Sequence, residues 1–249
     1  ERQRRCHLSW NDAGDRLLAV GSSTGVSLWS VGDGRACHAS VVATGAAHAK
    51  VVCGAFVSPG LVLATAGRRA DADAGGTGSG GGRAWPHVCA GLCVWDTLAP
   101  PGAALVAHDG ASDAAPAAMQ AEYTALAWEA GRQRLLCGTK EGELRIFDLR
   151  MQRVAQRLDA TGGTGAALRH CLLLPSTGRL ATLSAAAELK IWSLSDFECL
   201  DTVPKLHQMP RGNVGGMLGW ADALTCAALL SEHHLVTGGH DGSVVLTRL

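Results

Sequence analysis

The segment Asp241-Gly-Ser-Val-Val-Leu-Thr-Arg-Leu249 decides the fold of this chain, because four earlier segments repeat its plan. Each segment begins with a small or acidic residue, usually next to a glycine, which is typical of a tight turn. Apolar residues two positions apart follow, and most copies end on an aromatic residue and a small polar one. This alternation predicts a β-strand. The other copies are Thr24-Gly-Val-Ser-Leu-Trp-Ser-Val31, Ala90-Gly-Leu-Cys-Val-Trp-Asp-Thr-Leu98, Glu141-Gly-Glu-Leu-Arg-Ile-Phe-Asp-Leu149 and Ala187-Glu-Leu-Lys-Ile-Trp-Ser-Leu194.

Further short strands are predicted before each copy, among them Arg16–Val20 and Arg134–Gly138. Short strands that are separated by Gly, Asn or Asp turns at intervals of about ten residues indicate an all-β meander. A meander that repeats along the chain predicts a β-propeller. We expect five blades, at about residues 1–44, 45–109, 110–159, 160–207 and 208–249.

One segment interrupts the pattern inside the second blade. Residues 68–88 include Ala70-Asp-Ala-Asp-Ala-Gly-Gly-Thr-Gly-Ser-Gly-Gly-Gly82, which has too few apolar side chains to form a core. We expect residues 68–88 to be a disordered insertion. It would form a surface loop between the second and third strands of the blade.

The predicted third strands share an anchor at their ends. Trp95-Asp96 and the variant Phe147-Asp148 resemble the Trp-Asp endings of WD repeats, and the chain is identified as a WD-repeat β-propeller on this pattern. We expect the Asp of each pair to accept backbone or arginine hydrogen bonds at the rim of its blade. The predicted structural anchors of the repeats are Trp29, Trp95, Asp96, Phe147, Asp148, Trp192 and Asp241.

The two ends of the pattern bear on the number of blades. Few residues precede the first predicted strand, and no fourth strand is predicted after the third strand of the last blade. In closed propellers an N-terminal segment often supplies a missing fourth strand. We expect residues upstream of Glu1 to add two blades and to complete a seven-blade ring. The alternative is a partly open arc of five blades.

Histidines precede the first strands of several blades, at His48, His108 and His207. In WD repeats such a histidine joins a hydrogen-bonded set with a Ser or Thr of the second strand, an Asp of the next turn and the Trp of the third strand. The last blade offers His207 with Thr237 and Asp241, and the second blade offers His48, Thr65 and Trp95. We expect these sets to fasten loops rather than to bind metal.

Composition limits the possible classes of function. The 249 residues carry 22 basic and 22 acidic side chains, which argues against a nucleic-acid surface because such surfaces need clustered Lys and Arg. No apolar run reaches the length of about 18 residues that a spanning helix needs, so we expect no direct membrane insertion. The nine cysteines include no Cys-x-x-Cys pair, and six fall in predicted strands. This usage favours reduced thiols in a cytosolic compartment.

Two motifs resemble catalytic signatures but have the wrong surroundings. Gly76-Thr-Gly-Ser-Gly-Gly81 matches a dinucleotide fingerprint, yet no helix is predicted after it. Gly21-Ser-Ser-Thr-Gly25 matches a nucleophile elbow, yet it joins two predicted strands. A propeller hydrolase remains an alternative, with the turn acids Glu141, Glu188 and Asp241 as its repeated carboxylates. We expect no enzyme, no catalytic residue, no cofactor and no metal.

A narrower resemblance covers the chain from about Val51 to its end. The phrase Leu92-Cys-Val-Trp-Asp-Thr-Leu-Ala-Pro-Pro101 resembles the C-terminal propeller of the DmX-like (rabconnectin) family. The segments Leu63-Ala-Thr-Ala-Gly67, Leu105-Val-Ala-His-Asp-Gly110, Glu141-Gly-Glu-Leu-Arg-Ile-Phe-Asp-Leu-Arg150, Leu189-Lys-Ile-Trp-Ser-Leu-Ser195 and Asp241–Leu249 are similar to the same family.

The resemblance implies a function. DmX-like proteins are very long cytosolic scaffolds associated with assembly and regulation of the vacuolar proton-pumping ATPase on endomembranes. It therefore implies a non-catalytic interaction domain, with pump subunits and partner scaffold proteins as candidate partners, in the cytoplasm or peripheral on endomembranes or vesicles. The alternative is a WD-repeat scaffold of another complex, such as a ciliary, trafficking or ubiquitin-ligase receptor complex.

Overall fold

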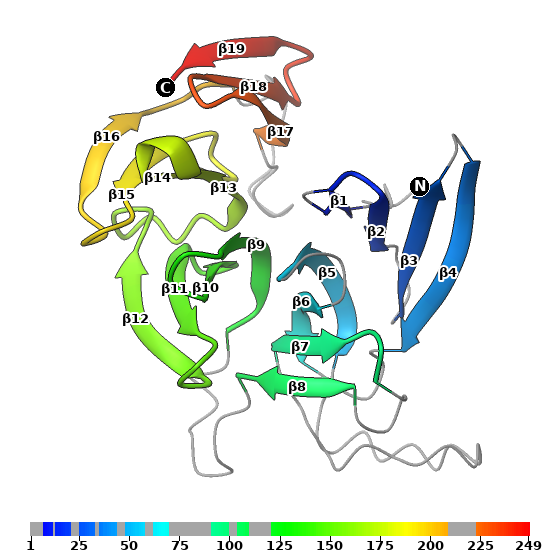
Figure 1. The fold of residues 1–249 in the computed structure, drawn as a ribbon. Helices are drawn as coiled ribbons and strands as arrows, with labels where there is room; N and C mark the ends of the chain where they lie inside the picture. The colour runs from blue at the N-terminus through cyan, green and yellow to red at the C-terminus, as the bar shows by residue number, and fades with distance from the viewer. Residues whose placement is uncertain are drawn as a thin grey trace. The chain divides into compact units, whose positions relative to one another are not determined.

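The computed structural model describes residues 7–11, 13–20, 25–32, 35–43, 48–57, 62–69, 91–99, 104–109, 121–208 and 223–249. These residues form strands β1 to β19 in five antiparallel sheets, which are the blades of a five-bladed β-propeller (Figure 1). The predicted all-β propeller with five blades is confirmed. Helix in the described residues is limited to the short 3-10 turn η2 (Pro175–Thr177), and no helix there is long or apolar enough to cross a membrane.

Each sheet is a meander in which every strand pairs with the next one in the chain. Blade 1 consists of β1 (His7–Trp10), β2 (Arg16–Val20), β3 (Gly25–Gly32) and β4 (Arg35–Ala43). Blade 2 consists of β5 (His48–Phe56), β6 (Val62–Arg69), β7 (Leu92–Asp96) and β8 (Leu105–His108). Blade 3 consists of β9 (Tyr123–Glu129), β10 (Arg134–Thr139), β11 (Glu143–Asp148) and β12 (Arg153–Asp159).

Blades 4 and 5 differ in strand number. Blade 4 has β13 (Leu168–Leu174), β14 (Arg179–Ser184), β15 (Leu189–Ser193) and β16 (Cys199–Val203). Blade 5 has β17 (Leu224–Ser231), β18 (His234–Gly239) and β19 (Val244–Arg248), and no described strand pairs with the other side of β19.

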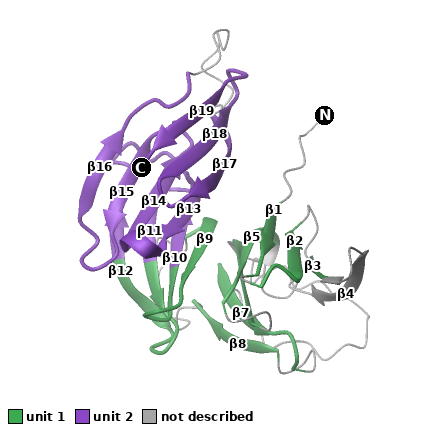
Figure 2. Cartoon of the chain, turned by 45° about the horizontal axis from the view of Figure 1, so that its top comes forward, with its two compact units in different colours: residues 1–135, 146–156 green, residues 136–145, 157–249 purple. Residues whose placement is uncertain are grey.

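The chain divides into two compact units, residues 1–135 with 146–156 and residues 136–145 with 157–249 (Figure 2). In the first unit β5 lies against β1 and β2, and β9 lies against β5 and β6. In the second unit β13 lies against β17. First strands of successive blades therefore contact one another within a unit, as the innermost strands of a propeller do.

The cores within each unit lie between neighbouring sheets. In the first unit Val26 and Leu28 of blade 1 share a buried cluster with Val51 and Leu63 of blade 2. In the second unit the buried cluster combines third-strand residues of blade 4 with Leu224 and Leu235 of blade 5, among others. Alternation along a strand turns every second side chain to one face, so each sheet can present apolar side chains to the next blade.

The turns before the third strands of blades 3, 4 and 5 share an unusual backbone conformation. Gly142 and Gly242 have φ of 84° and 77°, and Ala187 takes the same place before β15 with a φ of 58°. Glycine adopts positive φ without steric cost, which is the physical reason for Gly142 and Gly242 at this place in blades 3 and 5.

The insertion in blade 2 begins later than the sequence predicts. β6 extends through Arg68 and Arg69, because their backbones continue the pairing with β5 opposite Lys50 and His48. The remainder of the predicted insertion, with Gly76–Gly81, lies outside the described residues. The Gly21–Gly25 motif joins β2 to the antiparallel β3, as expected for a hairpin and not for a nucleophile elbow.

Candidate functional site

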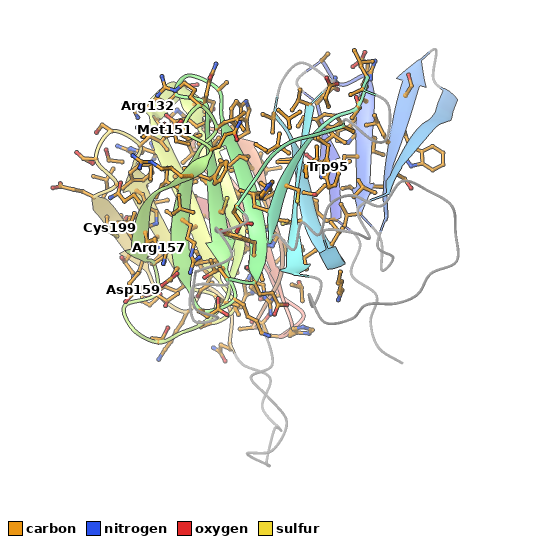
Figure 3. All side chains as sticks on the ribbon, turned by 90° about the horizontal axis from the view of Figure 1, so that it is seen from below. Trp95, Arg132, Met151, Arg157, Asp159 and Cys199 are labelled. Carbon is orange, nitrogen blue, oxygen red and sulfur yellow. The ribbon has the colours of Figure 1, made fainter. Side chains whose placement is uncertain are left out.

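Two of the predicted anchors make the same buried hydrogen bond. In blade 2 the Trp95 Nε1 donates to Thr65 Oγ1 at 2.8 Å, and in blade 4 the Trp192 Nε1 donates to Thr182 Oγ1 at 2.8 Å. Trp95, labelled in Figure 3, is 2% exposed. Each indole lies opposite a leucine of the second strand and reaches the threonine two residues further on. The bond ties the third strand to the second inside the blade.

The other blades carry different residue pairs at these two places. In blade 3 the fully buried Phe147 replaces the tryptophan, and Cys137, two residues after Leu135, replaces the threonine. In blade 1 the half-buried Trp29 lies opposite Leu17, and Ala19 stands at the threonine position. The aromatic anchor and its hydroxyl partner therefore occur together in two blades only.

Blade 5 holds a polar network around the buried His207. Its Nε2 lies 2.8 Å from Thr237 Oγ1, and its Nδ1 lies 3.0 Å from Ser243 Oγ and 3.3 Å from Asp241 Oδ1. Asp241 also accepts hydrogen bonds from the Gln208 and Ser243 backbone N–H groups. The structure brings together His207, Thr237 and Asp241, as the sequence predicts, and adds Ser243, which the sequence analysis missed. A serine directly after the Asp-Gly turn was the available signal.

The Ser-His-Asp composition of this network does not make a catalytic triad. In a triad the imidazole uses one nitrogen for the nucleophile and the other for the carboxylate. Here both Ser243 and Asp241 lie at Nδ1, and Nε2 faces the buried Thr237. Hydrogen bonds from the Ser243 hydroxyl and backbone, and from Gln208, hold the pKa of Asp241 well below its usual range. The arrangement fastens the segment before blade 5 to the turn between β18 and β19.

The anchor carboxylates Asp96 and Asp148 bind the turns that follow their strands. Asp96 Oδ1 accepts from the Leu98 N–H at 2.9 Å. Asp148 accepts from the N–H groups of Arg150 and Met151 at 2.9 and 3.1 Å, and its Oδ2 lies 3.4 Å from the Arg150 guanidinium. Burial alone would raise the pKa of Asp148, but these hydrogen bonds and the Arg150 charge lower it.

The remaining candidate residues lie in separate turns or have side chains that the structure does not describe. Glu141 is exposed in the turn before β11, and the Glu188 N–H bonds to Ser184 in the turn before β15. The side chain of His48 is not described. Among the described residues, no group of three or more His, Cys, Asp or Glu side chains could hold a metal ion.

The described cysteines form no disulfide with one another, and most of them are buried in strands. Cys53, Cys93, Cys137 and Cys171 fit the role of small apolar residues, and burial raises the pKa of Cys171 to about 12. Cys226 is different, because it lies in β17 but is exposed. Figure 3 also labels exposed side chains on the outer strands, namely Arg157 and Asp159 of β12 and Cys199 of β16.

An apolar face is exposed on blade 5. Val244 and Leu246 of β19 are 76% and 62% exposed, whereas the equivalent Leu144 and Ile146 of blade 3 are 0% and 1% exposed. Their equivalents in the other blades are also buried, namely Val26 and Leu28, Leu92 and Val94, and Leu189 and Ile191.

Neighbouring strands extend this face of blade 5. Register places Val236 of β18 between Leu246 and Ala228 of β17, and the nearby Leu230 is 67% exposed. Exposed apolar faces occur at protein or membrane interaction sites, at ligand grooves and on aggregation-prone surfaces. The sequence alone did not reveal it, because these residues follow the same apolar pattern as their buried equivalents.

A groove lies beside the same strand, within the second unit. It has a volume of about 220 Å³ and runs between the outer strands of blade 4 and the end of β19. Its lining consists of the aliphatic residues Leu189, Ile191, Leu200, Val203 and Leu249 together with Arg179, Asp201 and Arg248. The described part of the site is thus an exposed apolar surface on blade 5 rather than a pocket of converging acids and bases.

Comparison with known proteins relates part of this chain to DmX-like protein 1. No protein-family model matches the sequence. DmX-like protein 1 of Mus musculus is 30% identical over 156 residues, which are 61% of this chain and 4% of that protein. DmX-like protein 1 of Homo sapiens is 29% identical over 120 residues, which are 47% of this chain and 4% of that protein. The chain thus spans only a small part of the relatives' length. It is a β-propeller domain distantly related to DmX-like protein 1.

Proposed function

We propose that this propeller is a non-catalytic protein-interaction domain of a large WD-repeat scaffold, and that the scaffold supports assembly of the vacuolar proton-pumping ATPase. The relation to DmX-like protein 1 carries the proposal. A propeller also presents many loops on a rigid framework, which suits it to several protein contacts.

The anchors have a structural role in this proposal. Trp95 and Trp192 join strands through Thr65 and Thr182, and the remaining anchors close turns or fill the cores. The scaffold acts in the cytoplasm, peripheral to endomembranes, and neither binds nucleic acid nor inserts into the membrane. It needs no cofactor.

Affinity purification of the intact protein tests the pump assignment. We expect pump subunits and partner scaffold proteins to co-purify with the intact protein, and to be lost when residues 1–249 are deleted. A pull-down that contains neither pump subunits nor partner scaffolds contradicts the assignment. Co-purification with a ciliary, trafficking or ubiquitin-ligase complex instead would move the domain to that system.

We also propose that a further blade of the same protein covers the apolar face of blade 5. Support comes from the chain's own repeats: Val26 and Leu28 of blade 1 pack against blade 2, and Leu189 and Ile191 of blade 4 pack against blade 5. Alkylation of single-cysteine variants of the intact protein provides the test. Val244→Cys should react slowly and Leu98→Cys, at a 71% exposed position in blade 2, should react quickly. Equal rates contradict the covering blade.

A further inference from the structure

Two turns of blade 3 lie side by side at one end of its sheet. The first turn, residues 130–133, joins β9 to β10, and the second turn, residues 149–152, joins β11 to β12. The Leu149 N–H of the second turn donates to Gln133 O of the first at 3.0 Å. Side chains of the two turns and of the residues that flank them therefore form one surface, which we call the turn surface.

Arginines dominate the turn surface. Arg132, Arg150 and Arg153 are exposed, and Arg134 at the start of β10 is half-buried. Met151 lies between Arg150 and Arg153 in the sequence and is 51% exposed. Figure 3 shows the labelled Arg132 and Met151 at the same end of the structure. The turn surface thus combines clustered positive charge with one exposed apolar side chain.

The acidic residues of the turn surface are much less exposed than the arginines. The side chains of Glu129 and Asp148 are only 12% and 5% exposed, whereas those of Arg132 and Arg150 are 43% and 62% exposed. Glu129 Oε1 lies 3.3 Å from Arg132 Nη1, and Asp148 Oδ2 lies 3.4 Å from Arg150 Nη2. The two turns and their flanking residues contain no other Asp or Glu. The charge that reaches solvent is therefore positive.

Arg153 differs from the other two exposed arginines, because it forms no ion pair with another described residue. It begins β12, and the exposed Asp159 ends the same strand. A strand of this length spans about 20 Å. This exceeds the screening length of about 8 Å at physiological salt, so Asp159 does little to neutralise Arg153. Arg153 is thus available to a carboxylate from outside the blade.

The composition of the turn surface favours a protein partner over a membrane. Arginine and methionine are enriched at protein interfaces, where lysine is depleted. Membrane-binding surfaces commonly use lysine together with aromatic residues at the level of the lipid headgroups. The two turns and their flanking residues contain neither lysine nor an aromatic residue. Gln133 and Gln152 are exposed beside the arginines, and their amide groups can bond to the backbone of a peptide.

We propose that the turn surface binds an acidic segment of a partner protein. Carboxylates of the segment pair with Arg132, Arg150 and Arg153, because a guanidinium group presents a planar fork of donors that matches a carboxylate. An apolar residue of the segment contacts Met151. The inference rests on the protein-interaction role proposed above, for which it names a surface and the chemistry of the partner, but it does not depend on the pump.

Fluorescence polarisation with labelled peptides on the intact protein tests the inference. The acidic probe is Gly-Asp-Glu-Leu-Asp-Glu-Leu-Asp-Gly, the amide control carries Asn and Gln in place of Asp and Glu, and the basic control carries Lys at the same places. We expect the acidic probe to bind at least about tenfold more tightly than the amide control and to bind more weakly as salt is added. Vesicles of phosphatidylcholine with phosphatidylserine are the membrane probe, and the protein should not bind to them.

Variants of the protein locate the binding. Arg153→Glu should weaken binding of the acidic probe by about tenfold, because attraction becomes repulsion while no ion pair within the described structure is lost. Arg157→Glu is the matched control, since Arg157 is exposed in the same strand, about 13 Å further along. This control should change the affinity by less than about twofold. Arg132→Glu with Arg153→Glu should bind the basic control more tightly than the acidic probe.

Three outcomes overturn the inference. They are equal binding of the acidic probe and the amide control, equal effects of Arg153→Glu and Arg157→Glu, and binding to the vesicles without binding to the acidic probe. The last of these would assign the turn surface to a membrane. Pump subunits that co-purify although the peptides fail leave the pump assignment intact, and peptide binding without pump subunits contradicts only that assignment.

Discussion

Trp192 donates its indole N–H to the hydroxyl of Thr182 at 2.8 Å, across two adjacent strands of blade 4. Trp192 is 5% and Thr182 1% exposed, so water cannot replace either partner. Blade 3 reaches a buried arrangement without this bond, by placing Phe147 and Cys137 at the equivalent positions. The protein thus contains a polar and an apolar version of the same contact.

Loss of the threonine hydroxyl should destabilise blade 4. Thr182→Val leaves the indole N–H buried without its acceptor, which costs about 1–3 kcal/mol. Thr182→Cys with Trp192→Phe imitates blade 3 and should lose less stability than the sum of the two single changes, because it removes both partners. Urea unfolding of the wild type, Thr182→Cys, Trp192→Phe and the double variant measures the coupling, and strictly additive losses would contradict a direct bond between the two side chains.

The turn before β11 should tolerate no side chain at Gly142. Its φ is 84°, and an added Cβ would lie 2.5 Å from Thr161 Oγ1 and 2.9 Å from Ala166 O. We expect Gly142→Ala to destabilise by about 2–4 kcal/mol, from the left-handed backbone and the collision together. Gly178→Ala is the matched control, since its φ is 62° and nothing lies within 4 Å. This control should lose about 1 kcal/mol, and equal losses in both variants would exclude the collision.

Acid should weaken the contact between blades 1 and 2 through His7. The imidazole Nε2 lies 2.9 Å from Gly54 O, and burial lowers the pKa of His7, an effect that this hydrogen bond only partly opposes. The unfolded chain, with a histidine pKa of about 6.5, then binds the proton more readily than the folded chain. The free energy of unfolding should fall as the pH drops below about 6.5. Denaturant midpoints at pH 7.5 and 5.5 should differ more for the wild type than for His7→Gln, and an equal difference rules out His7 as the cause.

The cysteines should differ widely in reactivity. Burial raises the pKa of Cys171 to about 12, so almost no thiolate exists there at neutral pH, whereas Cys199 is exposed. Iodoacetamide at pH 8 should modify Cys199 in the native protein and leave Cys171 unmodified until denaturant is added. Rapid native modification of Cys171, detected by peptide mass spectrometry, would contradict the buried position.

Much of the fold could be predicted because the geometry of a strand depends on residues that are close together in the sequence. The period of two and the turn residues placed all third strands, and they also placed Trp95 and Trp192 at strand ends. Asp96 and Asp148 accept backbone hydrogen bonds, as expected for carboxylates next to a turn. The sequence also predicted the grouping of His207, Thr237 and Asp241, because the spacing of a blade fixes which turns meet.

Other features could not be read from the sequence. The end of β6 was misplaced at Arg68 and Arg69, because pairing with β5 extends the strand through two arginines that resemble the start of a loop. The sequence around Cys226 is typical of a buried strand. Cys226 is nevertheless exposed, because no described element covers that face of β17. Ser243 entered the His207 network through a side-chain contact between segments 36 residues apart.

The final segment Asp241–Leu249 illustrates the difference between what the sequence determines and what the tertiary structure decides. The sequence by itself determined that it forms a turn and a strand, since glycine after aspartate and alternating apolar residues act through local backbone geometry. It also placed Val244 and Leu246 on one face of that strand. Only the tertiary structure decided that no described sheet packs against this face, so that Val244 and Leu246 are exposed among the described residues. Burial depends on which sheet packs against a strand, and identical local patterns in Leu144, Ile146, Val244 and Leu246 carry no information about that neighbour.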